Sequence, residues 1–304
     1  PAVEISDDVS AASPFVVDST DDAVDASIGD GACSTATGTC TLRAAVQESN
    51  AFFGSDTIQV PAGTYEITLP EADPFDDASG DLDIGDHTTI SGAGSGSTII
   101  DGGGLDRVFE LTGRSTTVSG VTVRGGDTPV SGGGIQNGGN LTLNDVVVSG
   151  NIAGIDGGGI AVTSGSTLTV TDSTIADNTA TRDGGGLFAG TGSTLTISNS
   201  TISGNSGRVG GGIQSRAQPA TLTTLTLSEN SSVDGAGGLN NEGTATLTRS
   251  TLHANTGANG GGIVNVGTLS IVNSTVSGNT ATGNGGGVSN SETLEMTNVT
   301  IAEN

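Results

Sequence analysis

Short runs in which apolar residues alternate with hydroxyl-bearing residues recur along most of this chain. Clear examples are residues 141–143, 195–197 and 269–271, which read Leu-Thr-Leu, Leu-Thr-Ile and Leu-Ser-Ile. A period of two puts the aliphatic side chains on one face of a strand and the hydroxyls on the other. The runs are rich in Thr, Ser, Gly and Asn, which are poor helix formers. The pattern therefore predicts β-strands and not a helical repeat.

These runs belong to a unit that recurs every 24 to 27 residues. Each unit has three small residues, mostly glycine, followed by an aliphatic residue, and later an aliphatic residue three places before an asparagine. The aliphatic residues after the glycines are Ile135, Ile160, Leu187, Ile213, Leu239, Ile263 and Val288. The asparagines are Asn151, Asn178, Asn205, Asn230, Asn255, Asn279 and Asn304. Because one unit can bury its apolar side only against its copies, the period predicts a solenoid.

The unit predicts an all-β parallel β-helix whose coils are spaced by about 4.8 Å. In that arrangement equivalent residues stack in columns along the rod. The column of Leu143, Val170, Ile197, Leu222, Leu247, Ile271 and Met296 is expected inside. The glycine triplets mark a turn where the backbone needs positive φ or passes close to its neighbour. The asparagines are expected to form a structural ladder, each amide donating to one neighbour and accepting from the other.

The region before the repeats is different. Cys33 and Cys40, the only cysteines, lie in a short Gly/Thr-rich stretch that can close as a disulfide, which points to an oxidising compartment. The following residues 41–48 predict a Thr-capped amphipathic helix that covers the first coil. We thus expect one continuous domain with three parts. Residues 1–55 carry the disulfide and capping helix, residues 56–130 form irregular first coils, and residues 131–304 form the regular repeats.

Residues 40–45 (Cys-Thr-Leu-Arg-Ala-Ala), 50–51 and 56–65 resemble the CSLREA-type amino-terminal region of bacterial secreted right-handed parallel β-helix proteins. The resemblance continues through residues 89–94, 97–102 and 121–126. Thr41 replaces the Ser of the motif and Ala44 its Glu, a departure that affects only a contact on the helix surface. The repeats are also similar to the GGAI and FxxN units of polymorphic outer-membrane adhesins. The resemblance implies a right-handed, single-stranded β-helix that is secreted or attached to the cell surface, without assigned catalysis.

The charge of the chain limits the kinds of molecule that it can bind. It has 33 acidic residues, eight arginines and no lysine, with a formal net charge of −25. Such a field repels nucleic acid and anionic membranes, and no apolar stretch is long enough to span a membrane. Carboxylates are ligands that calcium prefers. The candidate ligands are Asp81, Asp83 and Asp86, preceded by Asp73, Asp76 and Asp77, with solvated loop acids as the alternative.

Two sets of charged residues are candidate active sites. Asp145 and Asp172 share a column in adjacent coils, about 5 Å apart, as a glycosidase carboxylate pair could. Arg182, Arg208 and Asp234 share another column beside Asp156 and Asp183. A polysaccharide lyase needs a cation near a uronate and a base for its α-proton. The alternative is a surface network of ion pairs. Phe188 is the only aromatic residue after Phe109, which counts against a carbohydrate site.

The sequence favours a structural or adhesin-like β-helix outside the cytoplasm, without catalysis and without a cofactor other than calcium. The alternative is a polysaccharide lyase or glycoside hydrolase acting on a uronate-containing polysaccharide. Expected partners are cell-surface or extracellular-matrix components. A second copy stacked end to end is also expected, because the repeat stops at Asn304 within a coil and leaves a strand edge. Either that edge is covered or more chain follows in the native protein.

Overall fold

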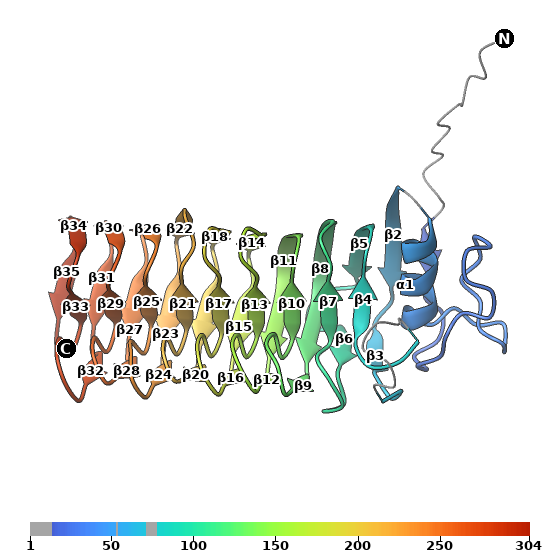
Figure 1. Cartoon of the computed structure of the whole chain (residues 1–304), viewed down its shortest axis with the longest axis horizontal. Coiled ribbons are helices and arrows are strands. Elements are labelled where there is room, and N and C mark those ends of the chain that lie inside the picture. Colours follow the sequence, from blue (N-terminus) through green and yellow to red (C-terminus); the bar gives the residue numbers. More distant parts are fainter. Residues whose placement is uncertain (1–13, 53, 71–77) are drawn as a thin grey trace, which may run out of the picture.

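The chain forms a rod of stacked coils with one helix at its amino-terminal end (Figure 1). This computed structural model describes residues 14–52, 54–70 and 78–304. Every pairing between its named strands is parallel, as in Leu141↔Leu168 and Leu168↔Leu195. The predicted all-β solenoid is therefore confirmed. The described chain has no helix long and apolar enough to cross a lipid bilayer.

Three strips of short strands run along the rod, and the same part of every coil contributes to the same strip. The first strip carries two strands per coil, which merge in the long strands β8 and β11. Its first row is β1 (Phe15–Val16), β2 (Ser55–Val60), β5 (His87–Gly92), β8 (Ser115–Arg124), β11 (Asn140–Ser149), β14 (Thr167–Thr171), β18 (Thr194–Ser198), β22 (Ala220–Thr223), β26 (Thr244–Thr248), β30 (Thr268–Val272) and β34 (Thr293–Thr297). Its second row, continuous with β8 and β11, is β3 (Gly63–Glu66), β6 (Thr98–Asp101), β15 (Thr174–Ala176), β19 (Thr201–Ser203), β23 (Thr226–Ser228), β27 (Thr251–His253), β31 (Thr275–Ser277) and β35 (Thr300–Ala302).

The other two strips have one strand per coil. The second strip has nine strands among the described residues: β4 (Leu82–Ile84), β7 (Phe109–Leu111), β10 (Ile135–Asn137), β13 (Ile160–Val162), β17 (Leu187–Ala189), β21 (Ile213–Ser215), β25 (Leu239–Asn241), β29 (Ile263–Asn265) and β33 (Val288–Asn290). The third strip is β9 (Asp127–Thr128), β12 (Ile152–Ala153), β16 (Thr179–Ala180), β20 (Ser206–Gly207), β24 (Ser231–Ser232), β28 (Thr256–Gly257) and β32 (Thr280–Ala281).

Aliphatic columns fill the inside of the rod as the alternation predicts. Leu143 and its equivalents are fully buried as far as Ile271. Met296, predicted to lie inside, is instead 49% exposed, because it lies in the last coil and no further coil packs over it. The glycine triplets fit close backbone contacts. A Cβ on Gly159 would lie 2.7 Å from the carbonyl oxygen of Gly186 in the next coil, too close for any side chain.

The seven repeat asparagines form a continuous ladder of hydrogen bonds. Asn205 is typical: its Nδ2 donates to Oδ1 of Asn230 at 2.9 Å and to the backbone oxygen of Ile175 at 2.9 Å. Its Oδ1 accepts from both the backbone N–H and the Nδ2 of Asn178, each at 3.0 Å. Asn205 is fully buried, so the ladder satisfies polar groups that water does not reach. A second, shorter ladder of Asn241, Asn265 and Asn290, which the sequence analysis did not predict, runs along the second strip.

The helix α1 (Leu42–Ala51) covers the amino-terminal end of the stack beside β2 (Figure 1). Thr41 is its N-cap, with Oγ1 accepting from the backbone N–H of Ala44 at 3.1 Å. Leu42, Ala45 and Val46 are buried in the core, which agrees with the predicted capping face. Ala44 is also fully buried. The expectation that position 44 makes a contact on the helix surface is therefore wrong, because this side of the helix also faces protein.

Charged residues of α1 hold the segment that precedes it. Arg43 is 1% exposed, pairs with Asp22 at 2.7 Å, and donates to the backbone oxygen of Gly80 at 2.8 Å. The carboxylate of Glu48 accepts from the backbone N–H groups of Gly29 and Gly31 at 2.7 and 3.1 Å. The predicted disulfide between Cys33 and Cys40 is confirmed, with Cα atoms 5.0 Å apart. The amino-terminal segment is thus held to the helix by an ion pair and hydrogen bonds, and the disulfide closes a loop within the segment.

Replacing Asn205 by alanine should destabilise the rod by about 3 kcal/mol, because buried donors of Asn178 and the carbonyl of Ile175 lose their partners. The free energy of unfolding in urea measures the effect. Asn144→Ala, at an exposed position of β11, is the control and should change it by less than about 0.5 kcal/mol. Equal effects of the two substitutions would show that the ladder contributes nothing.

Candidate functional site

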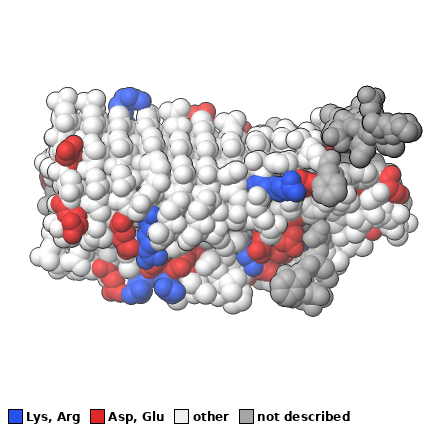
Figure 2. All heavy atoms as spheres, turned by 45° about the horizontal axis from the view of Figure 1, so that its top comes forward, with Lys and Arg blue, Asp and Glu red and all other residues white. Residues whose placement is uncertain are grey.

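The structure gathers the five charges predicted for one turn into two adjacent columns just before the glycine triplets. Asp156 and Asp183 follow one another, and the backbone N–H of Asp183 donates to Oδ1 of Asp156 at 3.1 Å. Arg182, Arg208 and Asp234 form the neighbouring column, where the N–H of Asp234 donates to the carbonyl of Arg208 at 2.8 Å. Figure 2 shows basic and acidic side chains grouped in a few places on a mostly uncharged rod.

These charges are paired with one another. Arg208 lies between Asp234 at 3.0 Å and Asp183 at 3.8 Å, and Arg182 lies 4.0 Å from Asp156. The side chains of Arg182 and Arg208 are 54% and 48% exposed. Exposed pairs of this kind add little stability, but they remove the repulsion that stacked like charges would otherwise create.

Two further residues complete the cluster, and neither was predicted from the sequence. Arg216 pairs with Asp183 at 3.2 Å and with Glu242 at 2.7 Å. Each stands three residues after the aliphatic residue that follows its glycine run, Ile213 for Arg216 and Leu239 for Glu242. Opposite charges at the same position of successive coils therefore indicate this ion pair in the sequence. We call the seven residues Asp156, Arg182, Asp183, Arg208, Arg216, Asp234 and Glu242 the charged cluster.

Burial and ion pairing shift the pKa values of two residues in this cluster. Desolvation raises the pKa of Asp156, against the lowering effects of the Asp183 backbone N–H and of Arg182. Desolvation lowers the pKa of Arg216, but its hydrogen bond to Glu242 and the charges of Glu242 and Asp183 outweigh this and raise it overall. The side chain of Asp183 is 5% exposed, and its two oxygens face Arg208 and Arg216. A carboxylate held between two guanidinium groups is poorly placed to take a proton from a substrate.

The column of Asp145 and Asp172 has a backbone explanation. Both are exposed, and both have positive φ, 52° and 51°. Every later member of the column shares this left-handed conformation: Asn199, Thr224, Arg249, Asn273 and Asn298. Asn and Asp tolerate this conformation better than other residues with side chains. The conformation of the turn therefore accounts for the presence of aspartate at both positions. Asp145 also accepts a hydrogen bond from Ser95 at 2.8 Å.

The acids expected as calcium ligands are only partly brought together. Asp81, Asp83 and Glu110 each place one carboxylate oxygen within 4.8 Å of the others. Asp86 does not belong to this group and lies 3.8 Å from Arg114 instead. Arg107 already supplies positive charge to the group, at 2.8 Å from Asp81 and 3.0 Å from Glu110. Asp73, Asp76 and Asp77 lie outside the described residues.

Comparison with known proteins finds a family and two distant structures. The model of the family described as right handed beta helix region matches residues 106–304. No curated protein matches the sequence. The A-module of the mannuronan C-5 epimerase AlgE4 from Azotobacter vinelandii is 16% identical, with 86% of this chain and 91% of that chain covered and a TM-score of 0.35. For the AlgE6 A-module of the same organism the identity is 14%, the coverage 86% and 89%, and the TM-score 0.34. A likeness this distant says nothing of substrate or reaction.

Replacing Thr224 by asparagine should stabilise the rod by about 1 kcal/mol, because a β-branched residue is strained at its φ of 56°. Thermal or urea unfolding measures the gain. Thr223→Asn, one residue earlier in β22, is the control and should not stabilise. A gain at both positions would indicate an effect unrelated to the turn.

The rod should lose stability as the pH rises from about 4 to about 8. Burial raises the pKa of Asp81 from 3.8 to about 8, despite the opposing charge of Arg107. Across that window the folded chain keeps a proton that the unfolded chain has released, so each increase in pH favours unfolding. The loss should be on the order of 6 kcal/mol, measured by urea unfolding across the window. Asp81→Asn should flatten the profile, whereas Asp127→Asn, an exposed control in β9, should not. Stability that rises with pH and a slope unchanged in Asp81→Asn would both contradict this assignment.

Proposed function

This chain belongs to the right-handed β-helix family, and on that premise we propose that it is a structural, adhesin-like rod without catalytic activity. Residues 1–55, 56–130 and 131–304 act as successive parts of one continuous domain. Nine coils in the second strip, each advancing about 4.8 Å, give a spacer on the order of 40 Å long. Its partners are components of a cell surface or an extracellular matrix.

The internal pairing of the charged cluster carries this proposal. A lyase working through these residues needs an arginine available for a substrate carboxylate and a base that can accept a proton. Arg208 and Arg216 each contact two acidic residues of the cluster. Arg208 and Arg216 act within the cluster as counterions for stacked acids, so this part of the cluster serves the rod itself.

The amino-terminal segment supports a place outside the cytoplasm. Disulfides persist in oxidising compartments, and the bridge between Cys33 and Cys40 closes the segment that leads into α1. Arg43, which matches the Arg of the CSLREA motif, is buried in an ion pair with Asp22. The residue of this segment that matches the motif thus has a structural role in the fold, and this supports a relationship to the secreted β-helix proteins.

Incubation of the purified chain with alginate and with polygalacturonate should release neither unsaturated uronate ends nor new reducing ends. Ultraviolet absorbance and a reducing-sugar assay measure the two products, and a polysaccharide lyase acting on the same polymers is the positive control. Asp183→Asn, which removes the most enclosed charge of the cluster, should behave like the native chain. Release of unsaturated ends by the native chain that Asp183→Asn abolishes would overturn the proposal in favour of a lyase.

A further inference from the structure

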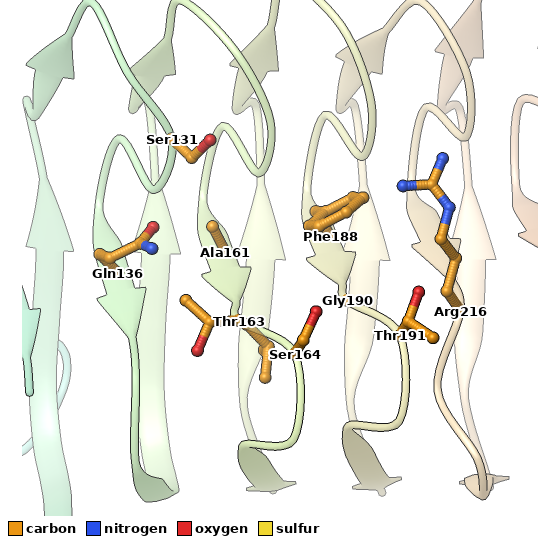
Figure 3. Close-up of a pocket in the computed structure, with 10 residues that line it drawn as sticks. Ser131, Gln136, Ala161, Thr163, Ser164, Phe188, Gly190, Thr191 and Arg216 are labelled. Carbon is orange, nitrogen blue, oxygen red and sulfur yellow. The ribbon is translucent and has the colours of Figure 1, made fainter. Parts of the chain in front are cut away.

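One column on the outside of the second strip has a gap. The residue after each inward-facing aliphatic residue points outward, and in successive strands from β10 to β25 these are Gln136, Ala161, Phe188, Gln214 and Asn240. Four of the five have long or planar side chains, whereas Ala161 has only a methyl group. The surface is therefore hollowed above Ala161, between Gln136 on one side and Phe188 on the other (Figure 3).

The hollow is a shallow cavity of about 280 Å³ with a mixed lining. Hydroxyl groups come from Ser131, Thr163, Ser164 and Thr191, and apolar surface comes mainly from Phe188, with Ala161, only 2% exposed, at the floor. Its volume is close to the lower end of ordinary small-molecule sites. The gap is one coil wide, about 4.8 Å, which is the space that one ring fills when it packs against an aromatic side chain.

The aromatic wall is held in place from behind. The guanidinium carbon of Arg216 lies 5.2 Å from the centre of the Phe188 ring, a cation–π distance. Arg216 is itself fixed by Glu242 at 2.7 Å and Asp183 at 3.2 Å. The ring thus meets a ligand in an arrangement already formed, which lowers the entropic cost of binding.

The opposite wall offers a hydrogen-bond donor. Gln136 lines the hollow, and its Oε1 is buried and has no partner among the described residues. Figure 3 shows the amide of Gln136 directed toward Ala161 and the hollow. An amide donor, four hydroxyl groups and one aromatic ring suit a ligand that has both hydroxyl oxygens and an apolar C–H face.

The charges around the hollow select against anions. Among the described residues, Arg216 is the only charged one that lines the hollow, and its charge is matched by Glu242 and Asp183. The chain as a whole carries a formal net charge of −25, which repels anionic ligands at longer range. Uronates and phosphorylated ligands are therefore disfavoured compared with neutral ones.

We propose that the hollow between Gln136 and Phe188 binds one pyranose ring of a neutral glycan. The inference rests on the proposed function of an adhesin-like rod, for which it supplies the ligand class. The ring packs its C–H face against Phe188 above Ala161, and its hydroxyl groups bond to Gln136 and the rim. No covalent step is involved.

Affinity electrophoresis of the native chain through gels containing soluble starch, galactomannan, mixed-linkage glucan or xylan tests the proposal. At least one of these polymers should retard the chain. Ala161→Gln, which restores the side chain found at positions 136 and 214, should weaken the retardation at least tenfold in apparent Kd. Phe188→Leu, which keeps apolar volume but removes the ring, should do the same. Val264→Gln is the matched control, because Val264 is in the same outward column beyond the hollow and its change should leave binding unaltered.

Three results would overturn the site: no retardation by any of the four polymers, equal binding by native chain and Ala161→Gln, or retardation by alginate alone. Circular dichroism confirms that each variant folds. Sizing of the recovered polymer separates this inference from the proposed function. Shortened polymer contradicts a rod without catalysis but leaves the hollow in place, whereas intact polymer without binding contradicts only the hollow.

Discussion

Parallel stacking in register is the constraint on which the rest of this molecule depends. Each coil pairs only with the coils before and after it, so residues at one position must fit copies of themselves at a fixed spacing of about 4.8 Å. Aliphatic side chains satisfy that requirement by packing in columns, and asparagine amides satisfy it by bonding head to tail. A charged residue is repelled by a like charge at the same position of the next coil unless an opposite charge lies nearby. In the charged cluster a column of two acids lies beside a column that begins with two arginines, and the arginines pair with the acids.

The same constraint acts strongly on inward-facing residues and weakly on the outward-facing residues that are available to bind a ligand. An inward position is fixed by both neighbours, whereas an outward position can change from coil to coil with little effect on the stack. Asp145, Thr224 and Arg249 share one backbone conformation despite unlike side chains. The hollow at Ala161 arises in the same way, by a short side chain at one outward position, while the neighbouring Ile160 keeps its place in the core. A binding site arises on such a rod where one residue in an outward-facing column differs from its neighbours.

Most of the fold could be predicted from the sequence because the repeats can be aligned with one another, and the alignment shows which residues stack. Columns such as Leu143 to Ile271, the asparagine ladder and the glycine turn followed from spacing alone. The prediction was weaker where the period is absent. Asp86 was grouped with Asp81 and Asp83 by proximity in sequence, yet Glu110 from another coil takes that place. Arg216 and Glu242 lie outside the two charged columns that the spacing predicted, and the hollow consists of a short side chain between two long ones, which leaves no motif in the sequence.

The asparagine ladder also gives the rod an electrical direction. From Asn151 to Asn279, every Nδ2 donates to the Oδ1 of the next asparagine along the chain. The amide dipoles consequently point the same way and add along the axis. Turning an amide around would also set its Nδ2 against the backbone N–H of the preceding asparagine, so the backbone fixes the direction of the row at every coil. The two ends of the fibre are therefore inequivalent in electrostatic potential as well as in shape.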